Sequence, residues 1–335
     1  MPRPGDHRLK TFYLHIGHDK TGSSFLQSIL ARNCEQLENS GIHYPVEEGA
    51  QIVASRGHVT SGNRRIVETP EWTKLVRETS DGAPLISYEG LFNQAGREPD
   101  KTLPIWETWR QELGCDRISI LLFIRDPIDH AASLFQQASK TSNMKARSLS
   151  QYFMQYKRPT QLLTFMKKTS EIPTIDVTVR NYSRCKRDVV AITENWLGLD
   201  PKTLSTDGIP RSVNRSLTFA ELRTVLALSR YSKIQSLELA NRFSNTLPER
   251  KPFRAVPPIA TQDAMLTKFQ PVFEELKEYI AEEDQYQLEK FTPTKGSKKL
   301  DDEQLQVVND FVAGSKSKRV NLWRAAATRW RFRFT

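Results

Sequence analysis

Short segments of alternating hydrophobic and polar residues recur from residue 11 to about 200, and longer helical patterns follow. The segment 11–17 alternates and is rich in strand-forming residues, whereas the segment 118–124 is almost continuously apolar. Alternation predicts a half-buried strand, and an unbroken apolar run predicts a buried central strand of a parallel sheet. Three further strands are predicted at 42–44, 84–88 and 175–179.

Helical patterns lie between these strands and dominate after about residue 200. Thr218 and Glu221 have the spacing of a capping box before an apolar run, and a second helix is predicted over 274–283. Strand–helix units in this order predict an α/β fold, with a central, mostly parallel sheet flanked by helices and a helical C-terminal part. We expect one α/β domain over 1–300 and a basic, aromatic helical tail over 301–335.

A polar loop joins the first strand to a helical segment that begins near residue 25. It reads His18-Asp-Lys-Thr-Gly-Ser-Ser24. Backbone N–H groups at a helix start, hydroxyls and one ammonium converge in such a loop, which makes it a receptor for a phosphate-like anion. In nucleoside triphosphatases the lysine follows the second glycine, whereas Lys20 precedes Gly22, which favours a shorter anion. The alternative is an ordinary helix N-cap with solvated polar residues.

The residues around this loop resemble the opening of a known enzyme family. The segment 14–45 contains the loop, Asn33, Leu37 and Gly41-Ile-His-Tyr-Pro45. It is similar to sulfotransferases that use 3′-phosphoadenosine 5′-phosphosulfate (PAPS), above all to their bacterial, carbohydrate-type branch, whose fold is like that of P-loop nucleoside triphosphatases. The resemblance implies that Lys20 contacts the oxygen that bridges phosphate and sulfate. It also implies that the 5′-phosphosulfate is bound by Lys20, Thr21, Gly22, Ser23 and Ser24.

A second motif lies about a hundred residues downstream. The apolar strand 118–124 ends in Arg125-Asp126-Pro127, and Ser133 follows eight residues after Arg125. Pro127 can open the next helix, which would place Ser133 two helical turns from the strand end. The family resemblance implies that Arg125 and Ser133 together bind the 3′-phosphate of the nucleotide, a task that suits the planar fork of arginine donors. The alternatives are an ion pair of Arg125 with Asp126 or Asp129, and a solvated serine.

Polar residues follow the ends of three predicted strands. Lys20, Glu89 and Arg125 each come shortly after one of these ends. Because ligands of parallel sheets bind at the carboxyl ends of the strands, we expect the three side chains to share one rim. The polar segment 50–82, with a short helical pattern around Trp72, is expected to form a loop over this rim.

Two residues compete as the base that removes the proton of an acceptor hydroxyl. Burial would raise the pKa of Glu89 into a useful range, while Lys20 and Arg125 would lower it. The neutral imidazole of His58 suits the task near pH 7 without adjustment. The alternatives are a structural partner of the loop for Glu89 and a solvated loop residue for His58. His18, inside the loop, is expected to shape it.

Composition narrows the partners. The net charge of +10 suits an anionic ligand, and no helix-turn-helix, zinc-finger or RNA-binding motif accompanies it, so we expect no nucleic-acid partner. Three scattered cysteines, Cys34, Cys115 and Cys185, predict a reducing compartment without disulfides and provide no metal-ligand spacing. No apolar stretch is long enough to cross a bilayer, and no signal-peptide core follows Met1, so we expect a cytoplasmic protein.

The tail over 319–334 mixes aromatic residues with arginines. Such a segment can lie on the anionic inner face of a membrane as a peripheral contact. The alternative is a terminal helix that docks on the protein through Leu322, Trp323 and Trp330.

Taken together, the motifs predict a sulfotransferase that moves a sulfuryl group from PAPS to a hydroxyl by in-line displacement, with adenosine 3′,5′-bisphosphate (PAP) as product and no metal. The acceptor is expected to be a carbohydrate or glycolipid. One alternative is a nucleotide-dependent kinase, which the position of Lys20 and the lack of a clear magnesium-binding aspartate count against. Another is a nucleotide-binding module without catalysis. The sequence leaves the acceptor and the oligomeric state open.

Overall fold

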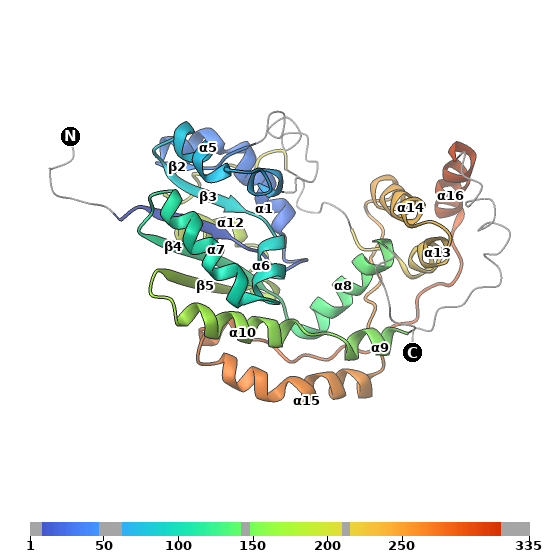
Figure 1. Cartoon of the computed structure of the whole chain (residues 1–335). Helices are drawn as coiled ribbons and strands as arrows, with labels where there is room; N and C mark the ends of the chain where they lie inside the picture. Colours follow the sequence, from blue (N-terminus) through green and yellow to red (C-terminus); the bar gives the residue numbers. More distant parts are fainter. Residues whose placement is uncertain (1–8, 47–61, 142–147, 210–214, 316–335) are drawn as a thin grey trace. The chain divides into compact units, whose positions relative to one another are not determined.

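The chain forms two compact units. The computed structural model describes residues 9–46, 62–141, 148–209 and 215–315. The first unit contains the sheet and its helices, and helices make up most of the second (Figure 1). The first unit takes 1–126, 158–213 and 271–286, and the second takes 127–157, 214–270 and 287–335.

A five-stranded, all-parallel sheet is the centre of the first unit. Its strand order is β2-β3-β1-β4-β5 (Figure 1). Every predicted strand is present, with ends within two residues of the prediction, so the predicted α/β fold is confirmed. The strands are β1 (Thr11–His15), β2 (Ile42–His43), β3 (Ala83–Ser87), β4 (Arg117–Ile124) and β5 (Ile175–Asn181).

Alternate residues of the central strands contribute to two separate hydrophobic cores. In β4, Ile118, Ile120 and Leu122 join one core, and Leu121 and Phe123 join the other. Helices cover both faces of the sheet, which explains why β4 is apolar along its whole length. The first core is covered by α5 (Trp72–Thr79), α6 (Gly90–Ala95), α7 (Pro99–Glu112) and α10 (Arg158–Ser170), and the second by α1 (Ser23–Arg32), α2 (Cys34–Asn39) and α12 (Val189–Leu197).

Shorter elements complete this part of the chain and include one difference from the prediction. The predicted short helix near Trp72 is α5, and α4 (Arg64–Val67) and α11 (Tyr182–Cys185) are single turns. The helix predicted over 274–283 does not form as such. Instead α15 (Ile259–Leu276), which has residues in both units, ends early in that range, and a 3-10 turn, η1 (Glu282–Asp284), follows.

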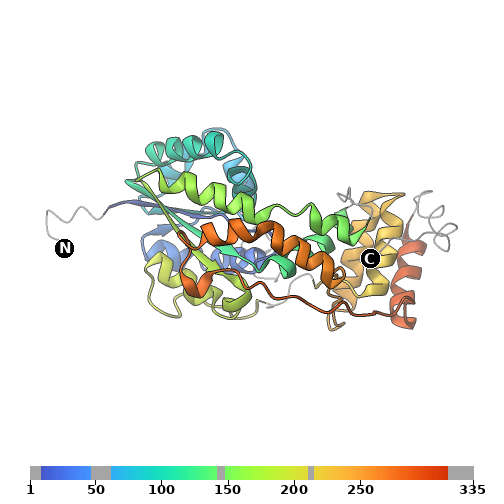
Figure 2. The same cartoon turned by 90° about the horizontal axis from the view of Figure 1, so that it is seen from below.

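The second unit is helical. Its helices α13 and α14 lie side by side, and α16 lies next to α14 (Figure 2). The unit contains α8 (Pro127–Thr141), α9 (Leu149–Met154), α13 (Phe219–Ser229), α14 (Lys233–Thr246) and α16 (Asp302–Gly314). Pro127 is the first residue of α8, as predicted.

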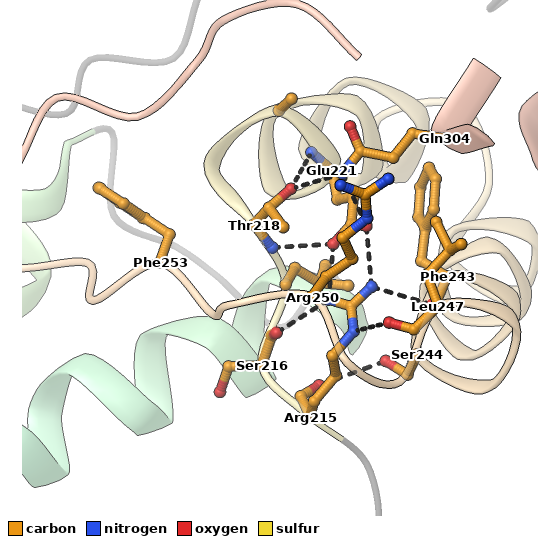
Figure 3. A network of polar contacts seen from close by, with 12 residues as sticks. Arg215, Ser216, Thr218, Glu221, Phe243, Ser244, Leu247, Arg250, Phe253 and Gln304 are labelled. Carbon is orange, nitrogen blue, oxygen red and sulfur yellow. Dashed lines mark hydrogen bonds and ion pairs between the residues drawn. The ribbon is translucent and has the colours of Figure 1, made fainter. Parts of the chain in front are cut away.

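A buried ion pair fixes the start of α13 (Figure 3). Arg215 donates to both carboxylate oxygens of Glu221 at 2.8 Å, and the two side chains are 5% and 0% exposed. Glu221 also accepts from the backbone N–H of Thr218 at 2.8 Å and from Nε2 of Gln304 at 2.9 Å. The predicted capping box is confirmed, and its carboxylate ties α16 to the start of α13.

The C-terminal predictions fall largely outside the described residues. The segment 319–334 lies beyond them, so both a membrane contact and a docked terminal helix stay predictions. The boundary expected at residue 300 also stays a prediction, although residues 302–314 form α16 of the second unit. In the four described ranges, no helix is both long and apolar enough to cross a bilayer.

Candidate anion-binding site

The loop after β1 continues along the sheet before it turns into α1. The N–H groups of Ile16 and His18 donate to carbonyls of β4 at 3.2 and 3.4 Å. The chain then passes through two left-handed residues, Lys20 (φ 67°) and Gly22 (φ 82°), and α1 begins at Ser23. The backbone pairing beyond His15 explains why the sequence pattern extends the first strand to residue 17.

Helix α1 starts without the side-chain cap that serine or threonine commonly provides. Its N-cap residue is Gly22, whose carbonyl accepts from the N–H groups of Phe25 and Leu26. The hydroxyl of Thr21 donates to the carbonyl of His18 at 2.6 Å, within the loop. Gly22 therefore does not provide the ordinary side-chain N-cap that is the alternative interpretation of this loop. A helix start of this kind presents its first N–H groups and the positive end of its dipole to an anion.

Two glycines allow the loop to pack closely. A Cβ atom at Gly17 (φ 29°) would lie 2.6 Å from Oγ of Ser23, at the start of α1. A Cβ atom at Gly22 would lie 2.8 Å from Cε2 of Tyr182, which follows β5. Both distances are below any normal contact, so a side chain at either position would displace the loop or its neighbour.

The backbone of Lys20 and the side chain of Arg125 are in direct contact. Arg125, directly after β4, donates from Nη1 to the carbonyl oxygen of Lys20 at 2.9 Å. Burial is the main cause that lowers the pKa of the Lys20 amine; Glu89 and Asp19 act to raise it, and Arg125 lowers it further. Two cationic residues therefore follow adjacent strands, β1 and β4, at the same edge of the sheet. Each of the two side chains can contribute a positive charge to the binding of an anion at this edge.

Glu89 follows β3, the other neighbour of β1. Burial is the main cause that raises the pKa of its carboxyl, and the nearby Asp19 raises it further, while Ser23 and Lys20 lower it. A carboxyl with a raised pKa is better suited to accept a proton near neutral pH. Lys20, Glu89 and Arg125 thus follow three neighbouring strands, as expected, and their roles in binding or catalysis stay predictions.

Asp19 has charged and polar contacts that the sequence did not indicate. Oδ2 of Asp19 lies 2.5 Å from Nη2 of Arg158, and Asn93 Nδ2 donates to Oδ1 at 3.2 Å. Phe92 contacts the same group of residues: its ring lies 4.7 Å from that of His18 and 6.0 Å from the guanidinium of Arg158. Asp19 could have been noticed beside Lys20, whereas Arg158 lies 139 residues away with no local signal.

A buried histidine lies behind the loop, at the end of β1. Nδ1 of His15 lies 2.7 Å from Oγ of Ser87, and burial lowers the pKa of His15 to about 4, so the ring is neutral. The polar segment 50–82 reaches this place through its described part. Oδ1 of Asn63 accepts from the N–H of Ser87 at 2.7 Å, and Gly62 approaches the Ser87 carbonyl so closely that a Cβ atom would lie 1.9 Å from it.

Two of the predicted site residues, His58 and Ser133, are not tested by the described structure. His58 lies outside the described residues. Ser133 is on α8, in the second compact unit, so its pairing with Arg125 stays a prediction. Arg180, near the end of β5, forms an ion pair with Asp284 at 2.6 Å. No cluster of histidine, cysteine and carboxylate side chains that could hold a metal ion is present in the described part of the chain.

No protein-family model and no curated protein matches the chain. Among solved structures, a sulfotransferase from Alicyclobacillus acidocaldarius is similar to this chain. The similarity covers 68% of this chain and 94% of the sulfotransferase, with 14% sequence identity and a TM-score of 0.34. The residues described above form a candidate anion site at the carboxyl edge of a parallel α/β sheet.

Proposed function

We propose that the chain is a sulfotransferase that transfers the sulfuryl group of PAPS to a hydroxyl of a carbohydrate or glycolipid. The observation that carries the proposal is the meeting of Lys20 and Arg125, which come from motifs 105 residues apart and are joined at 2.9 Å. The family resemblance implies that both motifs bind the same nucleotide. A chance occurrence of Lys-Thr-Gly-Ser would not require an arginine beside it.

The residues are of the kinds that bind an anionic group such as a phosphosulfate. The uncapped start of α1 offers backbone N–H groups, and the loop packs closely against its neighbours at Gly17 and Gly22. Lys20 and Arg125 supply positive charge at the same edge. Donors held in place before the ligand arrives stabilise developing charge without reorganisation, which makes them effective in catalysis.

In the proposed reaction the acceptor oxygen forms a bond to sulfur, and the bond between sulfur and the bridging oxygen breaks. The electron pair of that bond stays on the 5′-phosphate of the product PAP. Lys20 stabilises this growing negative charge, and the loop N–H groups hold the group in line with the acceptor. The acceptor proton passes to a base, for which Glu89 and His58 are both candidates.

Glu89 is the candidate that the described structure supports with geometry. It follows β3, next to the strand that leads to Lys20, and its pKa is raised mainly by burial. Glu89→Gln and His58→Gln separate the two. If Glu89 is the base, Glu89→Gln should lower kcat strongly and leave PAP binding intact, and His58→Gln should leave kcat nearly unchanged. If His58 is the base, the two variants should show the opposite pattern.

The proposal is tested by calorimetry with PAP, followed by a screen of hydroxyl acceptors with PAP³⁵S. Binding of PAP together with labelled product supports a sulfotransferase. PAP binding without transfer to any acceptor favours a nucleotide-binding module, and magnesium-dependent consumption of ATP favours a kinase. Absence of PAP binding contradicts the proposal.

A further inference from the structure

An ion pair connects the anion loop, at Asp19, to the start of α10, at Arg158. Arg158, the first residue of α10, lies 2.5 Å from Asp19, and their side chains are 12% and 25% exposed. Asn93 of α6 donates to the same carboxylate at 3.2 Å. An ion pair so largely withdrawn from water is screened much less than one on the surface, so its charges act on neighbouring groups.

Asp19 is linked to both groups to which the proposed reaction assigns roles. It precedes Lys20, whose backbone is held in the left-handed region at φ 67° and whose carbonyl accepts from Arg125. It also acts electrostatically on Glu89, from the loop side, while Lys20 acts on Glu89 with the opposite sign. From α1, the Ser23 side chain also faces Glu89.

We propose that Arg158 and Asp19 are a positioning pair, in which Arg158 fixes Asp19, and Asp19 fixes the loop at Lys20 and directs its negative charge at Glu89. This inference rests on the proposed function, because it deepens the role of the same site. A purely structural role is the competing explanation: the pair would then only attach α10 to the loop, and its charges would have no effect on Glu89.

The two explanations predict different titrations of Glu89. In Asp19→Asn the repulsion between two carboxylates is removed, so Glu89 should titrate at lower pH. In Arg158→Gln the negative charge of Asp19 is no longer offset by the guanidinium of Arg158 and acts more strongly, so Glu89 should titrate at higher pH. The double variant should titrate like Asp19→Asn, because Arg158 acts through Asp19.

The experiment follows the side-chain carboxyl signals of ¹³C-labelled glutamates by NMR in the full-length protein. The Glu89 signal is identified by its absence from the spectrum of Glu89→Gln. Opposite shifts in Asp19→Asn and Arg158→Gln would support the positioning pair. Shifts in the same direction, as water entering a loosened loop would cause, or no shift at all, would overturn it.

A matched control exists on α7 of the same unit. Glu107 and Arg110 form an ion pair at 3.1 Å with side chains 22% and 15% exposed, close to the values of Asp19 and Arg158. Glu107→Gln should leave both the Glu89 titration and kcat unchanged. A shift in this control equal to that in Asp19→Asn would show a general loss of packing and contradict the proposal.

Kinetics give an independent readout. Asp19→Asn should lower kcat, and adding Arg158→Gln to it should change kcat little, so the two substitutions should couple by about 2- to 150-fold in a double-mutant cycle, as residues in contact do. Additive effects would contradict the inference that Arg158 acts through Asp19. If the wild-type protein neither binds PAP nor transfers sulfate, the proposed function fails, but the NMR titration still decides whether the pair controls Glu89.

Discussion

Replacement of Gly22 by alanine gives a direct measure of how tightly the anion loop is built. The substitution adds a Cβ atom to a residue with φ 82°, 2.8 Å from Cε2 of Tyr182. The left-handed conformation costs an L-residue about 1–2 kcal/mol, and the displaced ring adds about 1–3 kcal/mol, the usual range for overpacking. We therefore expect a destabilisation of about 2–5 kcal/mol from the two terms together.

Gly41→Ala is the matched control. Gly41 has φ 77° in the same unit, and a Cβ atom there would meet nothing within 4 Å, so this variant carries the conformational cost without the contact. The difference between the two variants isolates the contact with Tyr182, about 1–3 kcal/mol. The double variant Gly22→Ala/Tyr182→Ala lacks the ring. Compared with Tyr182→Ala alone, it should lose only the conformational term, and the contribution of the contact should disappear.

The assay combines unfolding in denaturant with PAP calorimetry. Trp72, Trp106, Trp109 and Trp196 all lie in the sheet unit, so tryptophan fluorescence reports its unfolding once Trp323 and Trp330 are replaced by phenylalanine. If the strain displaces the loop, PAP affinity should fall by about 5- to 150-fold in Gly22→Ala and stay unchanged in Gly41→Ala. Equal stability and equal affinity in the two variants would refute the packing argument.

Four further outcomes are expected. Lys20→Ala should lower kcat by about 10²–10³-fold, as the loss of one preorganised charge-stabilising group does, measured in the labelled-sulfate assay. Arg125→Ala should weaken PAP binding by about 1.5–3 kcal/mol in calorimetry, and an unchanged affinity would remove Arg125 from the nucleotide site. Because the folded-state pKa of Glu89 is raised, wild-type stability should fall as pH rises through it, and Glu89→Gln should abolish that slope in unfolding experiments at several pH values. Arg215→Ala should destabilise the second unit by about 3–5 kcal/mol in hydrogen exchange, because it leaves the carboxylate of Glu221 buried without its main counter-charge.

The fold was largely predictable because its signals are local. The period-two alternation in 11–17 and the apolar run in 118–124 reflect one-sided and two-sided burial, and both strands form close to where they were expected. Parallel pairing then brings the residues after neighbouring strands to one edge, which accounts for the positions of Lys20, Glu89 and Arg125.

Contacts between distant segments could not be predicted in the same way. The pair of Asp19 with Arg158 and the packing of Gly22 against Tyr182 join segments that only the folded chain brings together. The helix expected over 274–283 was wrong for a different reason. A proline commonly ends a helix, yet α15 continues through Pro271 and stops at Leu276, so residues 274–276 are the end of α15 and no new helix begins after them in the expected range apart from the 3-10 turn η1.

The shared carboxylate of Glu221 has a practical consequence for any shortened version of this protein. A chain cut at residue 300 would keep the Arg215 pair but lose the amide of Gln304, which shields one carboxylate oxygen. Water would then reach an ion pair that is buried in the folded protein, and the helices α13 and α14 would lose their contacts with α16. Deletions designed to test the basic tail should therefore begin after residue 315.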